Sequence, residues 1–346
     1  MACCWKLCRN ETATVFYMSS ESASRDPTVV VTGVGAIIGQ GIVKSLRQCK
    51  GSVRVVGVDR DPDCLGPHLC DAFHAKPACD ESSRDYLEFW RQLISDESVD
   101  LVLPGLEVDL FFMNAHRDTL SDLGATLGLN AAGLIVLARD KWQLGQEIAK
   151  AGLMSIPTVL SRDWGECVEA LGSPPLLLKP REGSGSRGIV RIDDEPDLHY
   201  WSQKSGDNFM VQKIVGDGNE EYTAGAFGLG AGKTLPPIIF RRRLSPAGNT
   251  QYAEVETDIS IEEAIEKLSA YFKPVGPTNY QFRKEGDLIY LLEINPRLSS
   301  SSSLRAAFGY NEVQMSLDYF LDGIQPDQPE IIPGRAWRYA EDFVIK

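Results

Sequence analysis

The sequence predicts an α/β protein in which a doubly wound parallel sheet is followed by a domain of α+β type. Between residue 28 and about residue 130, apolar strand patterns alternate with helical patterns, which is typical of a parallel sheet with helices on both faces. From Pro157 to about residue 295, short strands, many glycines and antiparallel hairpin patterns follow instead. We therefore expect a first domain over 27–135 and a second over 136–346.

The composition is that of a soluble globular protein large enough for two domains, with 346 residues of which 43% are hydrophobic. A formal charge of −13 disfavours a general nucleic-acid binder, because affinity for phosphate backbones comes from clustered Lys and Arg. No apolar run is long enough to span a bilayer. Eight cysteines without paired spacing predict reduced thiols and a cytoplasmic protein. The polar, Ser-rich residues 1–26 predict a disordered leader rather than a signal peptide.

The elements of the first domain follow one another in a regular order. Apolar runs and helical periodicity predict strands at 29–31, 54–58 and 100–103, and helices at 40–48, 86–94 and 110–123. Helical patterning then resumes over 133–151 and stops before Pro157. Near the C-terminus we expect a helix over 303–320 and a short strand within 336–346.

A glycine turn, Gly33-x-Gly35-x-x-x-Gly39, joins the first strand to the first helix, and Asp59 ends the next strand. This pattern resembles a dinucleotide fingerprint and alone suggests an NAD(P)-dependent oxidoreductase. The signal is weak, because any tight strand-to-helix turn favours the same glycines. No Tyr-x-x-x-Lys pair follows it. NAD(P) binding therefore stands as an alternative beside a structural turn or a substrate site at the sheet edge.

Groups suited to phosphate appear early in the second domain. Lys179 ends an apolar strand, just before the run Gly183-Ser-Gly-Ser-Arg-Gly188. A lysine on a rigid strand is a fixed charge, and a Gly/Ser loop beside it offers N–H groups and hydroxyls to phosphate oxygens. The two together predict a nucleotide-phosphate clamp without the spacing of a P-loop. A surface turn is the alternative for the loop alone.

Two further strands carry candidate binding groups. The apolar strand at 209–214 could lie along an adenine, with Glu220 or Glu221 near the ribose. The strand at 238–243 ends in three arginines, of which Arg241 and Arg243 share a face and could address one anion. A solvated basic strand end is the alternative reading of that segment.

The most informative stretch is an apolar strand at 288–297 that ends in Glu293-Ile-Asn295-Pro-Arg297. Glu293 and Asn295 share one face of the strand, whereas Tyr290, Leu292 and Ile294 would project from the other. If the preceding turn centres near residue 287, Gln281 lies opposite Glu293. The resulting cluster of oxygen ligands suits Mg²⁺ when phosphate and water complete the shell. A solvated hairpin face is the alternative.

These elements occur in one order: strand lysine, glycine loop, hinge strand, acidic pair, arginine strand, Gln-bearing strand and Glu-x-Asn-Pro-Arg. That order resembles the ATP-grasp superfamily, and within it the large subunit of carbamoyl phosphate synthase and the single-module ligases similar to it. The resemblance covers about 28–315. It implies a Rossmann-like pre-ATP-grasp domain followed by an ATP-grasp domain, with a small lid over about 155–210.

The resemblance also implies roles for individual residues. Mg²⁺ or Mn²⁺ would be held by Gln281, Glu293 and Asn295. ATP would be bound by Lys141, Lys179, Gly183, Ser184, Gly185, Ser186, Gly188, Gln212, Lys213, Ile214 and Glu221. Catalysis would involve Arg297, which steadies the acyl phosphate, together with Arg241 and Arg243. Substrate would be faced by Gly35, Glu107 and Arg305.

A member of this superfamily would be an ATP- and Mg²⁺-dependent carboxylate–amine ligase, which forms an acyl phosphate, joins it to an amine or similar nucleophile, and releases ADP and phosphate. Synthesis of carbamoyl phosphate itself is not expected, because that subunit carries two such modules and this chain has one. A non-catalytic ATP-binding protein is a further alternative. The expected partners are small-molecule carboxylates and amines and, as an open possibility, a second copy of the chain, but neither nucleic acid nor membrane.

Overall fold

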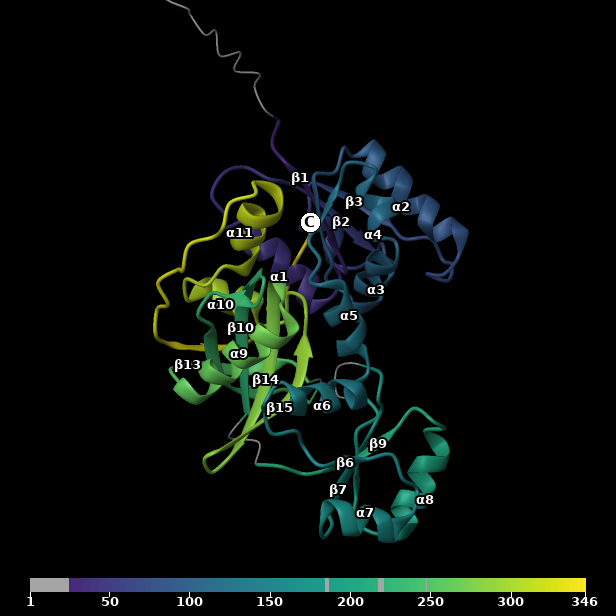
Figure 1. Cartoon of the computed structure of the whole chain (residues 1–346). Coiled ribbons are helices and arrows are strands. Elements are labelled where there is room, and N and C mark those ends of the chain that lie inside the picture. Colours follow the sequence, from purple (N-terminus) through teal and green to yellow (C-terminus); the bar gives the residue numbers. More distant parts are fainter. Residues whose placement is uncertain (1–24, 184–186, 217–220, 247) are drawn as a thin grey trace, which may run out of the picture.

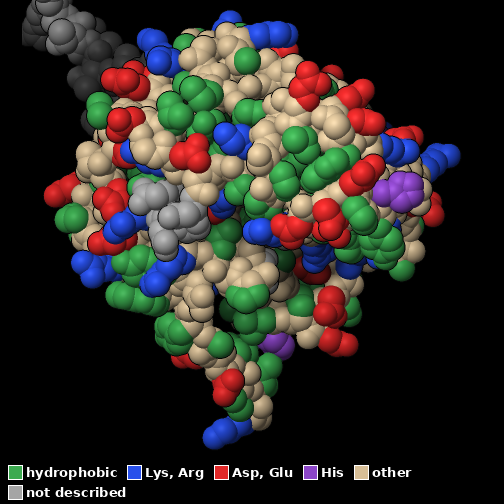
Figure 2. Space-filling model, turned by 90° about the horizontal axis from the view of Figure 1, so that it is seen from below, with side chains coloured by type: hydrophobic (Ala, Val, Ile, Leu, Met, Phe, Trp, Pro, Cys, Tyr) green, Lys and Arg blue, Asp and Glu red, His purple; other side chains and the backbone are tan. Residues whose placement is uncertain are grey.

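The computed structural model describes residues 25–183, 187–216, 221–246 and 248–346, and these residues form three sheets (Figure 1). Residues 1–24, which make up most of the predicted leader, lie outside the described residues. Within the described residues, no helix has the length and apolar character needed to cross a membrane. On the face seen in Figure 2, acidic and basic side chains are intermixed.

The first sheet is parallel and has the strand order β3-β2-β1-β4-β5. Its strands are β1 Thr28–Thr32, β2 Arg54–Asp59, β3 Ala72–Ala75, β4 Leu101–Leu103 and β5 Thr126–Leu127. Its helices are α1 Ile37–Leu46, α2 Arg84–Asp96, α3 Glu107–Ala115 and α4 Arg117–Ser121, with the short 3₁₀ helix η1 Gly66–His68. Alternate residues of β1 enter different cores: Val30 packs with α2 and α3, whereas Val29 and Val31 pack with α1. Helices therefore cover both faces, and the predicted doubly wound sheet is confirmed.

The large second sheet is antiparallel, with the order β15-β14-β10-β12-β13-β16 and β11 paired to β10. Its strands are β10 Glu221–Gly230, β11 Lys233–Thr234, β12 Ile238–Leu244, β13 Thr250–Glu256, β14 Val275–Glu285, β15 Leu288–Asn295 and β16 Arg335–Trp337. One face packs on α9 Ile259–Phe272 and α6 Lys141–Lys150 through an apolar cluster that includes Ile265, Tyr280 and Phe282. The opposite face carries polar side chains near the small sheet.

The third sheet is small and antiparallel, with the order β6-β9-β7-β8. It consists of β6 Thr158–Val159, β7 Leu176–Lys179, β8 Val190–Ile192 and β9 Met210–Lys213, with helices α7 Trp164–Leu171 and α8 Glu195–Lys204. These elements enclose their own core, to which Cys167, Leu178 and Val211 belong. Figure 1 shows them as a separate lobe below the large sheet. The predicted lid fold is present, whereas its range and its closure stay predictions.

Three predicted helices are interrupted in the structure. The helix expected over 110–123 is divided at His116 into α3 and α4, and the one expected over 133–151 is divided at Asp140 into α5 Ala132–Arg139 and α6. The helix expected over 303–320 consists of α10 Ser302–Ala307, α11 Glu312–Ser316 and the π-helical turn η2 Leu317–Leu321. Gly309 adopts φ +91° between α10 and α11, a conformation that a helix cannot continue through. The predicted C-terminal strand is limited to β16.

Candidate active site

A cavity of about 340 Å³ lies between the large sheet and the small sheet, next to helices of the first sheet. The polar face of β10, β12, β14 and β15 forms one wall, and β7 and β9 of the small sheet form another. Ile38 at the start of α1 and Glu107 at the start of α3 close the end next to the first sheet. A second cavity of about 500 Å³ adjoins it and shares Glu107 and Arg297. The site is therefore assembled from segments that are far apart in the sequence.

The β14–β15 hairpin brings the predicted metal ligands together. Gln281 pairs with Glu293 across the hairpin, which confirms the predicted opposition. The side-chain amides of Gln281 and Asn295 both donate to Oε1 of Glu293, the latter at 2.9 Å. The register shifts between Gln281 and Phe282, so that Leu292 is an extra residue on β15 and lines the cavity. The prediction that Leu292 points away from the oxygen cluster is therefore wrong, because a β-bulge reorients it.

The donor set of this cluster fits a hard divalent cation. It offers one carboxylate and two carboxamide oxygens on adjacent strands, and oxygen is the ligand that Mg²⁺ prefers. Among the described residues, no group of three His, Cys, Asp or Glu side chains could hold a metal by itself. A cation bound here would therefore need oxygens from another source, such as nucleotide phosphates, to complete its shell.

Two lysines line the cavity beside this cluster. Lys179 is the last residue of β7 and is only 9% exposed. Burial lowers its pKa to about 8, although Glu293 acts in the opposite direction and Lys141 adds to the lowering. Lys141 is the first residue of α6, and its ammonium donates to the carbonyl of Gly183. Two fixed positive charges therefore face the same space as the oxygen cluster.

The glycine loop after β7 is only partly described. Gly183 lines the cavity, and Gly188 adopts φ +76° where a Cβ would lie 2.9 Å from Pro180. The predicted phosphate ligands Ser184, Gly185 and Ser186 lie outside the described residues. Their role in binding ATP stays a prediction.

The hinge strand β9 contributes one side chain to the cavity. Gln212 is 8% exposed, lines the cavity and donates to Thr158 Oγ1 at 2.8 Å. The side chain of Lys213 is exposed, and its backbone N–H donates to Pro157 at 3.0 Å. Ile214 is half-buried beyond the end of the strand. Adenine binding by these residues stays a prediction.

Glu221 at the start of β10 is a buried carboxylate held by two arginines. Its Oε1 accepts from Arg242 at 3.0 Å and its Oε2 from Arg283 at 2.6 Å. Both arginines line the cavity, as does Glu221 itself. Glu221 therefore keeps this wall in a fixed geometry, and its predicted contact with a ribose stays a prediction.

The arginine strand β12 presents its middle member to the cavity. Arg242 is 5% exposed and donates to Gln281 Oε1 at 2.6 Å as well as to Glu221. Arg241 lies on the opposite face and pairs with Glu254 and Glu256 at 3.0 and 3.1 Å, and Arg243 stacks over a tyrosine ring at 4.5 Å. The prediction that Arg241 and Arg243 address one anion in the site is therefore corrected. The predicted alternation of the strand has the wrong phase. The signal that identifies Arg242 is the buried acid Glu221 on the neighbouring strand.

An ion pair marks the end of the cavity that faces the first sheet. Arg297 donates to Glu107 Oε1 at 2.7 Å and to the carbonyl of Leu298 at 2.9 Å. The Arg297 side chain is 11% exposed and that of Glu107 is 27% exposed. Ser299 and Ser300 line the same end. The structure thus brings together two residues predicted to face substrate or acyl phosphate.

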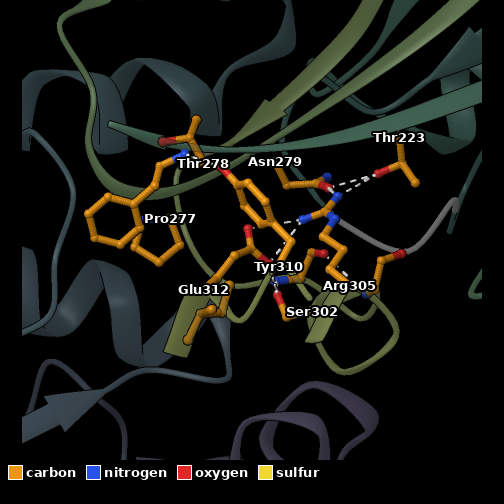
Figure 3. A network of polar contacts seen from close by, with 12 residues as sticks. Thr223, Pro277, Thr278, Asn279, Ser302, Arg305, Tyr310 and Glu312 are labelled. Atoms are coloured by element: carbon orange, nitrogen blue, oxygen red, sulfur yellow. Dashed lines mark hydrogen bonds and ion pairs between the residues drawn. The ribbon is translucent and has the colours of Figure 1, made fainter. Parts of the chain in front are cut away.

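The other two residues predicted to face substrate are occupied by the protein itself. Gly35 donates its N–H to Asp59 at 2.8 Å, and a Cβ at Gly35 would lie 2.8 Å from the thiol of Cys64. The N–H of Gly35 is thus used by Asp59 and its Cβ side is filled by Cys64, so neither is available to a pyrophosphate, which disfavours NAD(P). Arg305 is completely buried and pairs with Glu312 at 3.1 Å (Figure 3). The expectation that Arg305 faces substrate is therefore wrong.

Comparison with known proteins agrees with this arrangement. Residues 208–343 match a family described as ATP-grasp in the biosynthetic pathway with Ter operon. The carbamoyl phosphate synthase large chain of Beutenbergia cavernae is 24% identical over 338 residues, which cover 84% of this chain and 29% of that protein. The chain spans only 16% to 31% of the length of the curated relatives that it matches.

Two solved structures resemble nearly the whole chain. N5-carboxyaminoimidazole synthetase from Staphylococcus aureus, complexed with ADP, has a TM-score of 0.70 at 16% identity and covers 88% of this chain and 80% of its own. L-amino acid ligase from Bacillus licheniformis has a TM-score of 0.65 at 17% identity, with 90% and 78% covered. Together with the family match, these similarities confirm the predicted fold and the predicted resemblance to the ATP-grasp superfamily.

Proposed function

We propose that this ATP-grasp protein is an ATP- and Mg²⁺-dependent ligase that activates a small carboxylate as an acyl phosphate and joins it to an amine or similar nucleophile. The observation that carries the proposal is the composition of one cavity. Its walls combine the oxygen cluster around Glu293 with Lys141 and Lys179, and its far end carries Arg297. We further propose that 27–135 is the pre-ATP-grasp domain and 136–346 the ATP-grasp domain.

In the proposed reaction, the protein mainly positions charge. Lys141 and Lys179 bind oxygens of the ATP phosphates, and Mg²⁺, held by Gln281, Glu293 and Asn295, would neutralise charge on the phosphate being transferred. A substrate carboxylate oxygen attacks the γ-phosphorus, and the bond from that phosphorus to the ADP oxygen breaks. Little covalent chemistry falls to side chains, because preorganised cations stabilise the transition state.

We propose that Arg297 acts in the second half of the reaction. Its guanidinium lies at the end of the cavity away from the hinge strand, where the acyl phosphate would extend. The amine attacks the acyl carbon, the carbon–oxygen bond to phosphate breaks, and inorganic phosphate leaves as the new amide loses a proton. Closure of the small lobe over the cavity would keep water from hydrolysing the acyl phosphate.

The alternatives predict different behaviour. A non-catalytic ATP-binding protein would bind Mg·ATP without releasing ADP, whatever substrate is added. An NAD(P)-dependent oxidoreductase would bind nicotinamide cofactor at the glycine turn, which Cys64 and Asp59 occupy. A homodimeric assembly and a cytoplasmic location stay predictions.

The decisive experiment is a screen for ADP release with amino acids, sugar acids and other small carboxylates, each with and without small amines. We expect ATP turnover that depends on one carboxylate. The Glu293→Gln variant should lower kcat by about 100-fold, which is about 2.7 kcal/mol, because the cluster loses its only anion. Glu285→Gln, on the same hairpin but exposed and outside the cavity, should behave as wild type. Full activity of the Glu293→Gln variant would refute the metal assignment.

A further inference from the structure

The second cavity, of about 500 Å³, is larger than the first and has an apolar wall. It lies beside the C-terminal end of β15, against the neighbouring helices α3 and α5 (Figure 1). Val108 and Phe111 of α3 and Ala138 of α5 contribute to this wall. Val108 is 40% exposed, and Phe111 and Ala138 are half-buried, so part of the apolar surface has no cover from the protein itself. Such a volume and lining are typical of a pocket for a small organic molecule.

Charged pairs border the apolar wall. Arg139, the last residue of α5, donates to Glu182 at 2.8 Å. Its guanidinium also lies over the Phe111 ring, 5.2 Å from the centroid. At the border with the first cavity, Arg297 donates to Oε1 of Glu107 at 2.7 Å. Both arginines therefore have a carboxylate partner within the chain, which a carboxylate ligand in this cavity would have to displace.

Glu107 gives the second cavity its preference for charge. Its Oε1 is engaged by Arg297, whereas no donor among the described residues contacts its Oε2. The remaining cation of the lining, Lys141, donates to the carbonyl of Gly183 and also lines the first cavity. The unused carboxylate oxygen therefore favours a ligand that has N–H donors and a positive charge, and it disfavours a second carboxylate.

The border between the two cavities is the part of the site that matters for the second half of the proposed reaction. Arg297 lines both cavities, and the acyl phosphate would extend to it from the first. The nucleophile has to reach the acyl carbon from a side that nucleotide and metal do not occupy. The second cavity adjoins the first at this point, and its lining suits an ammonium group beside an apolar substituent.

We propose that the second cavity binds the amine substrate, and that this amine carries an apolar aliphatic or aromatic side chain. Its amino group donates to Oε2 of Glu107, and its side chain packs on Val108, Phe111 and Ala138. Ammonia would leave this apolar surface exposed to water, whereas a larger apolar amine removes it from water. The proposal rests on the proposed ligase function and names the class of its nucleophile.

Phenethylamine, which is an ammonium ion at neutral pH, is a probe that has both features. Calorimetric titration of the wild-type protein with Mg·AMP-PNP present measures its affinity and requires neither turnover nor knowledge of the carboxylate. We expect saturable binding that is about 10-fold tighter than that of ethylamine, because the ring packs on the apolar wall. Equal affinity for the two amines, or no saturable binding of phenethylamine, would overturn the proposal.

Two variants of α5 test where the amine binds. Ala138→Trp fills the second cavity with a ring, and we expect it to weaken phenethylamine binding by about 10-fold. Val136→Trp is the matched control, because Val136 lies on the same helix, is 65% exposed and is outside both cavities. It should bind phenethylamine as wild type does. Undiminished binding by Ala138→Trp that still binds Mg·AMP-PNP would overturn the assignment of the cavity.

Glu107→Gln tests the charge. A glutamine keeps an oxygen that accepts from Arg297 but removes the negative charge, so phenethylamine should bind about 10-fold more weakly. Unchanged affinity in this variant would overturn the contact with Glu107.

Hydroxylamine separates this proposal from the ligase proposal. It is small and uncharged at neutral pH, and it attacks an acyl phosphate to give a hydroxamate and free phosphate. In Ala138→Trp the rate of amide formation with phenethylamine, relative to that of hydroxamate formation, should fall about 10-fold. An unchanged ratio, with hydroxamate formed, would show that the cavity assignment fails alone. If wild type binds phenethylamine but no carboxylate supports release of ADP, the ligase proposal fails while the amine-binding site stands.

Discussion

The charge of Lys179 depends directly on its burial. Its side chain lies at the end of a strand between two sheets, and desolvation lowers its pKa from 10.5 to about 8. Phosphate binding requires the protonated form. The free protein should therefore lose this cation as the pH rises through about 8, within a range in which most proteins are stable.

We predict that kcat/KM for ATP falls as the pH rises through about 8, because kcat/KM reports the free enzyme. The pH profile of ADP release measures it. In the Lys179→Arg variant the side chain stays charged, so the profile should lose this inflection even if the activity is lower. An inflection that persists in that variant would assign the titration to another group.

Unfolding cannot explain such a fall in activity. Between pH 8 and 10.5 the unfolded chain binds the proton that folded Lys179 has released. Stability rises with pH wherever the unfolded state binds more protons, so this group makes the fold more stable across that window. As the pH rises, kcat/KM should fall while the contribution of Lys179 to the free energy of unfolding increases. Urea unfolding measured at the same pH values separates the two effects.

At the scale of elements, the N-terminal cap of α6 fixes the helix from which Lys141 reaches the cavity. Asp140 interrupts the predicted helix and caps α6 by accepting from the N–H groups of Trp142 and Gln143 at 2.9 and 3.2 Å. The same carboxylate pairs with Arg181, next to the glycine loop. Burial alone would raise the pKa of Asp140, but Arg181 and the N–H groups lower it overall. One side chain thus fixes the helix that presents Lys141.

We predict that Asp140→Ala destabilises the fold by about 1–2 kcal/mol, the usual effect of losing a cap, and also weakens Mg·ATP binding because Lys141 loses its anchor. Urea unfolding and nucleotide titration measure the two effects. Asp194 caps α8 in the same manner, accepting from Asp197 N–H at 3.0 Å, but lies away from the cavity. Asp194→Ala should reduce stability without changing nucleotide affinity. Equal nucleotide affinity of the two variants would show that the cap of α6 does not contribute to the nucleotide site.

The elements also show what could be predicted from the sequence. The prediction that Gln281 lies opposite Glu293 is correct, but the turn alone does not produce this pairing. With Glu285 opposite Leu288, the register set by the turn would place Leu292 opposite Gln281, and the bulge brings Glu293 there instead. The bulge at Leu292 could not be foreseen, because an extra residue changes no local pattern. The prediction of which β12 arginines face the cavity is wrong for a related reason. Three arginines follow one another in this strand, and only the partners Glu221 and Gln281 determine that Arg242 is the buried one. Local periodicity thus predicts the strands and helices, whereas contacts with residues distant in sequence determine which side chains are buried at the site.

At the scale of the whole molecule, the site depends on three sheets whose contacts are distant in sequence. The family of the fold could be predicted, because the order of the strand lysine, the arginine strand and the Glu-x-Asn-Pro-Arg motif is itself a sequence property. The pairing of Glu107 with Arg297 and the burial of Arg305 could not, because they arise only when the first sheet and the C-terminal helices pack on the large sheet. A sequence pattern does not indicate which polar residue becomes buried where such elements pack together.

A nucleotide bound between the sheets should therefore stabilise more than one of them. We predict that the non-hydrolysable analogue Mg·AMP-PNP slows amide hydrogen exchange in β7 and β9 of the small sheet and in β14 and β15 of the large sheet, because both walls line the cavity. At 100 times the dissociation constant, the ligand adds about 2.7 kcal/mol to the free energy of unfolding. Amides of α2, on the far side of the first sheet, should be protected only to the extent that global unfolding contributes. Protection limited to one of the two walls would show that nucleotide does not bridge them. The Glu293→Gln variant should reduce the protection of β14 and β15 first, because its loss of charge weakens the metal-dependent contact at that wall.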